Sequence, residues 1–385
     1  MTKLLAPLQS LKQGNWFKLI CGASFQHLPA VRNLAIAYTL AGADCIDVAA
    51  DPAVIAAVHE GLLVAKNLAQ EAEERGFPFR GNLPFLMVSL NDGEDPHFRK
   101  AEFNSINCPP TCPRPCETIC PAQAIVFNDQ KDSFSGIIAD KCYGCGRCVP
   151  VCPYEMIFTS SFVSTPGAVA PLVMSTGIDA IEIHTKVGRL ADFQRLWASI
   201  VPQVNKLKLL AVSCNDGEGL IDYLQTIYDL IAPHCQVLIW QTDGRSMSGD
   251  IGDGTTIATV KLGQKVLAAN LPGYVQLAGG TNSYTVPKLK AMSLLKRWGD
   301  GKIGKWGEKI TPPPHYPTTP YIAGVAYGSY ARVLLSPIFE QLENQEVSST
   351  GIYASVGLEN QPELLWQAVE LAYSLVSQIK SQSEL

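Results

Sequence analysis

The sequence has few charged residues and no long run of one sign. Asp, Glu, Lys and Arg make up 17% of the chain, and the formal net charge is -5. Hydrophobic residues make up 47%, which excludes a disordered chain. No basic cluster of the kind that binds nucleic acid is present. We therefore expect a globular protein that does not bind nucleic acid.

Long hydrophobic runs are also missing. The apolar stretch 34–50 is interrupted by Gly42, Asp44 and Asp47, well short of the ~20 residues that a membrane-spanning helix needs. The first twenty residues have neither the apolar core nor the cleavage site of a secretory signal. The sequence predicts a cytoplasmic protein without a membrane span. In a reducing compartment its twelve cysteines are expected to bind metal rather than to form disulfides.

Eight of these cysteines lie in two runs within one short segment. The second run, CYGCGRCVPVCP, contains Cys142, Cys145, Cys148 and Cys152. Its C-x2-C-x2-C-x3-C-P spacing is typical of bacterial two-cluster ferredoxins. The first run, CPPTCPRPCETICP, contains Cys108, Cys112, Cys116 and Cys120. It also ends in Cys-Pro, but each of its gaps holds three residues. The two runs together indicate iron-sulfur binding.

Zinc is the alternative metal, because paired cysteines also form tetrahedral zinc sites. Eight cysteines are enough for two such ions. The Cys-Pro endings and the ferredoxin spacing favour iron-sulfur clusters, more strongly for the second run than for the first. Between the runs, residues 124–142 predict two short strands around a polar turn, as in a ferredoxin half.

From Cys108 to Pro153 the chain resembles the ferredoxin fold, which has two related halves. In that fold the fourth cysteine of each run ligates the cluster of the other run. The resemblance implies one cluster held by Cys108, Cys112, Cys116 and Cys152. It implies a second cluster held by Cys142, Cys145, Cys148 and Cys120. The second cluster is expected to be 4Fe-4S, whereas the unusual spacing and the prolines of the first run leave its cluster open between 4Fe-4S and 3Fe-4S.

Outside this segment, short apolar strands alternate with amphipathic helical stretches, which predicts repeated βα units. The expected strands are 17–21, 45–48, 85–90, 180–184, 208–213, 236–241, 274–278 and 321–325. The expected helices are 29–40, 51–75, 167–176, 189–201, 220–232, 255–270 and 286–298. Eight strands predict an α/β fold, a TIM-like (β/α)8 barrel with an inserted two-cluster ferredoxin module, and a doubly wound sheet is the alternative.

These patterns divide the chain into four parts. We expect the first part of the barrel in 1–90, the ferredoxin-like insertion in 91–165, the remainder of the barrel in 166–342, and a C-terminal helical extension in 343–385. The insertion follows the third strand, so we expect the clusters to lie over the mouth of the barrel. The final amphipathic helix is expected to pack on the barrel. The glycine- and proline-rich residues 299–320 predict a surface loop.

Two glycine-rich loops follow the seventh and eighth strands, where barrels of this class bind phosphate. The candidate anion-binding residues are Gly279, Gly280, Thr281, Asn282, Gly328 and Ser329. They predict a phosphorylated ligand or a flavin. The alternative is that the glycines only form tight turns between strand and helix.

Acid-base candidates also occur at strand ends. They are Glu182, His184 and Asp216, with structural or solvent-exposed roles as the favoured alternative. The loop after the sixth strand offers Asp243, Arg245, Ser246, Asp250 and Asp253 as ligand contacts or as a cover of the mouth. No catalytic triad is recognisable, so no catalytic residue is assigned. The isolated cysteines, expected in the core, are Cys21, Cys45, Cys214 and Cys235.

The opening FKLICGASFQHLPAVRNLAIAYTLAGADCIDVAAD, the eight-cysteine insertion, and the segments QTDGRSMSGDIGDGTT and QLAGGTNSYT together resemble the cyanobacterial light-dependent period family. The resemblance spans nearly the whole chain. It implies a redox-sensing protein that adjusts the circadian period to light and associates with clock proteins, including the input histidine kinase. Clusters near a surface exchange electrons and change charge, which biases partner binding.

An enzyme is the main alternative to this sensor. A flavin- or phospholigand-binding barrel oxidoreductase would receive electrons from the ferredoxin module and reduce a substrate at the barrel mouth. A pure electron carrier ranks third, because it would not need so large a barrel.

Overall fold

The computed structural model describes residues 5–22, 28–93, 95–120, 123–127, 135–138, 141–142, 148–164, 166–244, 252, 254–296, 318–348, 351–352 and 357–380. Within these ranges no helix is both long and apolar enough to cross a membrane. Most of the glycine- and proline-rich stretch 299–320 lies outside the described residues.

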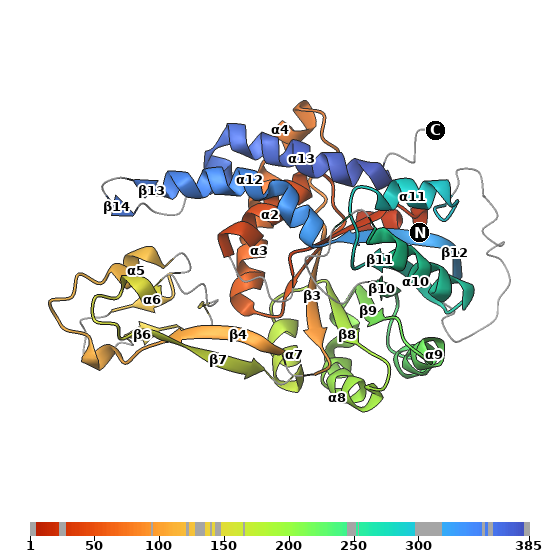
Figure 1. Ribbon diagram of the computed structural model, residues 1–385, viewed down its shortest axis with the longest axis horizontal. Helices are drawn as coiled ribbons and strands as arrows, with labels where there is room; N and C mark the ends of the chain where they lie inside the picture. The colour runs from red at the N-terminus through yellow and green to blue at the C-terminus, as the bar shows by residue number, and fades with distance from the viewer. Residues whose placement is uncertain are drawn as a thin grey trace.

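Eight parallel strands close into a barrel (Figure 1). In chain order they are β1 (Trp16–Ile20), β2 (Cys45–Ala49), β3 (Phe85–Asn91), β8 (Ala180–Thr185), β9 (Leu209–Asn215), β10 (Leu238–Asp243), β11 (Gly273–Ala278) and β12 (Thr318–Tyr327). Each coincides with a predicted strand. The prediction of a TIM-like barrel is therefore confirmed, and the closed sheet excludes the doubly wound alternative.

Helices follow the strands and cover the outside of the barrel (Figure 1). They are α2 (Leu28–Leu40), α3 (Pro52–Asn67), α4 (Ala69–Glu74), α7 (Pro166–Met174), α8 (Leu190–Ile200), α9 (Leu220–Ile231), α10 (Thr256–Ala268), α11 (Thr285–Ala291) and α12 (Ser329–Glu346). The prediction of one helix over 51–75 is wrong, because the backbone leaves helical geometry at Leu68 (φ -91°, ψ 6°). Helix α12 was not predicted, and Pro337 inside it obscures its pattern.

The barrel interior is apolar at the amino ends of the strands. Helix α1 (Ala6–Gln13) closes this end, where Leu11 packs with Trp16, Phe85 and Ile239. A larger apolar layer lies between the strands and the outer helices. The four isolated cysteines are buried, as predicted.

The last helix, α13 (Pro362–Lys380), packs across α2 and α12 and contacts β1, as predicted. Trp366 stacks on Phe77 with ring centroids 5.8 Å apart. At the other end of the helix, Lys380 Nζ lies 2.5 Å from the carboxylate of Asp44, which in turn accepts a hydrogen bond from the Phe17 amide. The short strands β13 (Val347–Ser348) and β14 (Gly351–Ile352) form a hairpin between α12 and α13.

The cysteine segment is inserted after β3 and before α7 as a separate module. It is joined to the barrel by an antiparallel ribbon of β4 (Asp95–Glu102) and β7 (Phe158–Ser164). The ribbon holds the module to the left of the barrel in the view of Figure 1. That the clusters lie over the mouth stays a prediction. The predicted hairpin is present as β5 (Ile125–Val126) and β6 (Gly136–Ile137), which pair antiparallel.

Candidate iron-sulfur module and barrel mouth

Two short helices bring the cysteine runs together in the module. Helix α5 (Pro115–Ile119) carries Cys116 and ends at Cys120, and α6 (Cys148–Val151) is followed directly by Cys152. The two helices contact each other. Thus Cys152 of the second run interacts electrostatically with Cys108 and Cys116 of the first run. Cys145 lies outside the described residues.

Backbone amides point at several of these sulfurs. The amide of Ala124 lies 3.2 Å from Cys120 Sγ, and the amides of Ala101 and Met156 lie 3.4 Å from Cys142 Sγ and Cys152 Sγ. Burial alone would raise the pKa of Cys152, but the surrounding amides lower it below its ordinary value. Amide hydrogen bonds of this kind stabilise thiolates, the form that binds metal.

An apolar cluster surrounds the same sulfurs. Ala101, Ile125 and Ile157 form it with the buried sides of Cys116, Cys142 and Cys148. Burial raises the pKa of Cys116 to about 11. Thiols in an apolar shell with amides aimed at their sulfurs fit the environment of an iron-sulfur cluster. Among the described residues, no group of three or more His, Cys, Asp or Glu side chains forms a metal-ion site.

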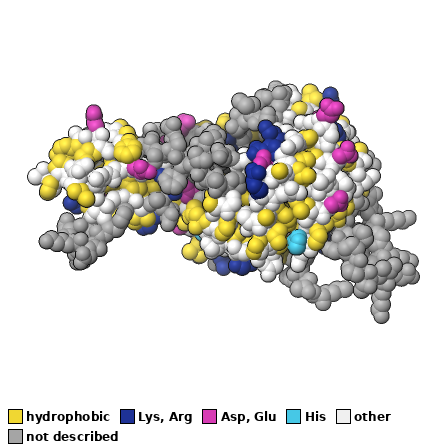
Figure 2. Space-filling view, turned by 90° about the horizontal axis from the view of Figure 1, so that it is seen from below, with side chains coloured by type: hydrophobic (Ala, Val, Ile, Leu, Met, Phe, Trp, Pro, Cys, Tyr) yellow, Lys and Arg dark blue, Asp and Glu magenta, His cyan; other side chains and the backbone are white. Residues whose placement is uncertain are grey.

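The surface of the module exposes hydrophobic side chains (Figure 2). Ile106 is 89% exposed, Tyr154 44% and Phe158 56%. Ile106 and Tyr154 lie two residues from Cys108 and Cys152, and both of these cysteines are only partly buried. Apolar surface and accessible thiols therefore occur together.

A second polar site lies inside the barrel. Lys18 of β1 is fully buried, and its Nζ lies 2.9 Å from Asp47 Oδ2 and 3.0 Å from Gln241 Oε1. Lys18 also forms an ion pair with Glu182. Burial alone would lower the pKa of Lys18, but the charges of Asp47 and Glu182 raise it above its ordinary value. Lys18 is therefore a charged, fully paired residue.

Neutral side chains complete this network. Gln241 Nε2 donates to Glu182 Oε1 (2.6 Å) and to Ser213 Oγ (3.2 Å), and its Oε1 accepts from Gln276 Nε2 (2.5 Å). Ser89 Oγ donates to Asp47 Oδ1 (2.7 Å). The network thus spans seven neighbouring strands of the barrel, β1 to β3 and β8 to β11.

At the carboxyl ends of the strands, His184 and Asp243 continue the network. His184 Nε2 lies 3.0 Å from Glu182 Oε1, and its side chain is 34% exposed. Burial would raise the pKa of Glu182, but Lys18 and His184 lower it to about 2. Burial raises the pKa of Asp243 to about 6, because the attraction of His184 offsets only part of this effect. The mouth is the end where barrel enzymes place reactive groups.

Two domain models match the chain. Residues 108–163 match the LdpA Fe-S cluster-binding domain, and residues 172–378 match the Light dependent period A C-terminal domain. A curated protein named Light dependent period A, from Synechococcus elongatus, is 43% identical over 374 residues, which are 97% of this chain and 94% of that protein. The chain belongs to the Light dependent period A (LdpA) family. The predicted family resemblance is thereby confirmed, and so is an iron-sulfur cofactor.

A distant likeness to a solved structure adds nothing on function. A pyruvate kinase from Cryptosporidium parvum aligns with a TM-score of 0.36 and 9% identity, over 98% of this chain and 72% of that chain.

The glycine-rich loops of this LdpA family member are tied into the barrel. Gly279 and Gly280 have φ of 66° and 83°, a conformation that favours glycine and supports the turn interpretation. The hydroxyl of Thr281 donates to the carbonyl of Ala326 (2.7 Å), and Asn282 Nδ2 donates to the carbonyl of Gly252 (3.1 Å).

The second candidate loop is held by an arginine. Arg332 donates to the hydroxyl of Ser329 (3.0 Å) and to the carbonyl of Ile20 (3.1 Å), and Gly328 lies against Ile20. Anion binding at these six residues remains a prediction.

The other polar candidates separate into two groups. Asp216 forms a surface ion pair with Lys265 (2.6 Å) and does not join the network of the barrel interior. Asp243 does join it, whereas the remaining loop candidates, Arg245, Ser246, Asp250 and Asp253, lie outside the described residues. Lys18, Asp47, Gln241 and Gln276 were not singled out from the sequence. Each of these four residues could have been found in the sequence as a polar residue inside an otherwise apolar strand.

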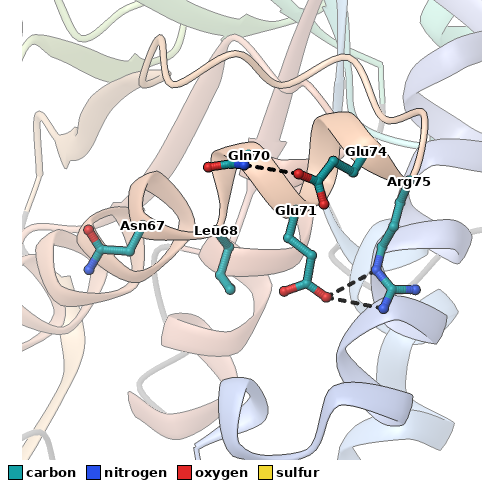
Figure 3. Close-up of a pocket in the computed structure, with 6 residues that line it drawn as sticks. All are labelled: Asn67, Leu68, Gln70, Glu71, Glu74 and Arg75. Carbon is teal, nitrogen blue, oxygen red and sulfur yellow. Dashed lines mark hydrogen bonds and ion pairs between the residues drawn. The ribbon is translucent and has the colours of Figure 1, made fainter.

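A shallow surface pocket lies at the junction of α3 and α4 (Figure 3). Its lining residues are Asn67, Leu68, Gln70, Glu71, Glu74 and Arg75. Glu71 is engaged by Arg75 (3.1 Å) and by the indole of Trp366 (2.9 Å), while Gln70 bonds Glu74 (2.9 Å). These contacts join the pocket wall to α13, and they indicate a structural role.

Proposed function

We propose that this LdpA family member is an iron-sulfur redox sensor that reports the cellular, light-dependent redox state to the circadian clock input pathway. Family membership and the Fe-S cluster-binding domain support an iron-sulfur protein. Clock proteins, including the input histidine kinase, are the partners in this proposal. The observation that carries it is the grouping of partly exposed cysteines with exposed apolar side chains on one module.

The proposed ligands follow the crossed scheme. Cys108, Cys112, Cys116 and Cys152 hold one cluster. Cys142, Cys145, Cys148 and Cys120 hold the other. The electrostatic interaction of Cys152 with Cys108 and Cys116 supports the first set, because it joins the two runs across α5 and α6. When bound, the clusters supply reversible one-electron chemistry.

The protein's own groups determine the reduction potentials of the clusters and how far a change in cluster charge affects the surface. Amides of Ala124 and Met156 bond the sulfurs of Cys120 and Cys152, and such bonds tune reduction potentials. Partial exposure of Cys108 and Cys152 brings the charge of the redox centre close to Ile106 and Tyr154. A change of charge beside an apolar contact surface alters the affinity of a partner.

The first test is anaerobic analysis of iron, acid-labile sulfide and flavin, with electron paramagnetic resonance, on wild type and two variants. We expect Cys152→Ser and Cys120→Ser each to remove one cluster, so each loses roughly half of the iron and a different resonance signal. The buried, isolated Cys235 provides the matched control, Cys235→Ser, which should keep both signals. Zinc without sulfide would contradict the proposal, and stoichiometric flavin would favour a reductase instead.

The sensing step has its own test. The input histidine kinase is titrated with oxidised and with reduced protein under anaerobic conditions, and we expect different affinities. Equal affinities would show that the clusters do not control this interaction, even if both clusters are present.

A further inference from the structure

The iron-sulfur module is connected to the barrel at two points of the chain. The chain leaves the barrel after β3, where Asp92 and Gly93 lie between the end of that strand and the start of β4. It returns from β7 directly into α7. The direction of the β4–β7 ribbon therefore depends on how these two connections are held against the barrel.

A buried carboxylate holds the first connection. Asp92 is 3% exposed, and its amide donates to the carbonyl of His184 (3.1 Å). Its Oδ2 accepts a hydrogen bond from the hydroxyl of Thr185 (2.6 Å). Thr185 has only one hydroxyl hydrogen to donate, so the hydroxyl of Tyr223 is the donor in the contact between these two hydroxyls (2.6 Å). Asp92 is thus tied to β8 and, through Thr185, to α9.

Arg189 lies against the other oxygen of this carboxylate. It directly precedes α8, and its Nη1 lies 3.3 Å from Asp92 Oδ1. On its other side, Arg189 Nε donates to Asp192 Oδ2 (2.9 Å). The donors of a guanidinium group are fixed in one plane, so pairing with two carboxylates at once holds the group in one orientation.

The guanidinium group occupies the space beside Gly93, where any other residue would place its side chain. A Cβ atom at Gly93 would lie 2.6 Å from Arg189 Nη1, closer than two such atoms can approach. The φ angle of Gly93 is not positive, so its backbone does not require glycine. The glycine is therefore needed for the close approach of Arg189.

The second connection depends on the same helix. Helix α7, into which the chain returns from the module, packs against α8 (Figure 1). Arg189 at the start of α8 contacts the first connection, and the body of α8 contacts the second. One helix of the barrel thus holds both ends of the inserted segment.

We propose that Arg189 is a positioning residue that fixes the direction in which the β4–β7 ribbon, and with it the iron-sulfur module, leaves the barrel. A glycine at the end of a strand would otherwise give the ribbon a hinge. Arg189 removes this freedom, because its guanidinium group fills the space beside Gly93 and pairs with Asp92. This inference concerns the connection alone and does not rest on the proposed sensing function.

Hydrogen exchange and small-angle X-ray scattering of the full chain, prepared anaerobically, test this role in two variants. Arg189→Ala removes the guanidinium group, and Gly93→Ala displaces it while keeping its charge. In both we expect amide exchange in residues 91–102 to become at least about tenfold faster, with no change in β9 to β12. The maximum dimension from scattering should increase, because the module samples more directions.

Two matched controls separate this contact from general effects of the same substitutions. Arg195→Ala removes an arginine that is 74% exposed and pairs with Asp192. Gly167→Ala adds a methyl group on the return connection, where a Cβ atom meets nothing within 4 Å. Both controls should exchange and scatter as wild type does.

The double variant shows whether the two residues act through one contact. Arg189→Ala and Gly93→Ala remove the same contact, so together they should speed exchange no more than the stronger single variant does. Additive effects would overturn the proposal. So would unchanged exchange and scattering in both single variants. Faster exchange throughout the barrel strands would show that Arg189 only stabilises the barrel, which would also overturn it.

Discussion

At the scale of single residues, buried thiols and buried charged side chains have different surroundings in this protein. In the module, thiols are surrounded by apolar side chains and by amides aimed at sulfur. In the barrel, Lys18 is buried only because carboxylates and an amide meet it on several sides. Both arrangements satisfy the rule that a buried polar group needs partners. Their consequences differ. The thiols of the module can bind a metal, whereas the ion pairs of Lys18 connect strands of the barrel to one another.

The ion pairs of Glu182 predict a loss of stability in acid. Its folded pKa of about 2 lies below the ordinary 4.5, so its contribution is complete above pH 4.5 and is lost as the pH falls towards 2. The shift corresponds to ~3 kcal/mol. We expect wild type to exceed Glu182→Gln in unfolding free energy at pH 7, and this difference to shrink between pH 4.5 and pH 2. Urea titrations measure it, and a difference independent of pH would contradict the assignment.

At the scale of elements, the C-terminal helix is part of the barrel wall. The apolar face of α13 contributes Leu365, Val369, Ala372 and Leu375 to the same core as the helices around it. Its two ends are fixed by the stacking of Trp366 on Phe77 and by the ion pair of Lys380 with Asp44. Loss of this face would uncover α2 and β1.

Leu375→Ala tests this role. The side chain is 1% exposed, and its removal leaves a cavity, so we expect a loss of about 2–5 kcal/mol in unfolding free energy. Leu63→Ala is the matched control, because Leu63 lies on α3 with 58% exposure and should change stability by less than about 0.5 kcal/mol. Chemical denaturation followed by circular dichroism measures both. Equal losses would show that α13 does not share the core.

At the scale of the whole molecule, the chain consists of a barrel and a module that is inserted between β3 and α7. The helices and strands of the module contact mainly one another, and the β4–β7 ribbon is its connection to the barrel. Strands β3 and β8, which flank the insertion, pair directly from Met87 to Asn91. The barrel therefore closes without help from the module.

Replacing residues 95–164 with a short Gly/Ser linker tests this independence. We expect the barrel to fold and unfold cooperatively, with the buried environments of Trp16 and Trp240 preserved in tryptophan fluorescence. Iron and sulfide should be lost completely. An aggregated or molten product would show that the module is required for the barrel.

The sequence determined the strands and the kind of metal site. Strands β1 to β3 and β8 to β12 were recognisable because each is a short apolar run between turn residues, and burial on both faces requires such runs in a parallel barrel. The cysteine spacing identified iron-sulfur chemistry because ligands of one cluster must be close along the chain. Helix α12 and the β4–β7 ribbon escaped prediction, because Pro337 and weakly apolar strands mask their patterns.

Only the tertiary structure decided where these parts meet. The sequence shows Lys18, Asp47, Glu182 and Asp243 as separate residues on four strands, and closing the barrel brings their charges into one network. It likewise placed the module after β3 but did not show the paired strands β4 and β7 that connect the module to the barrel (Figure 1). Local spacing encodes local ligands, whereas contacts between distant strands depend on sheet closure and register, which no short segment specifies.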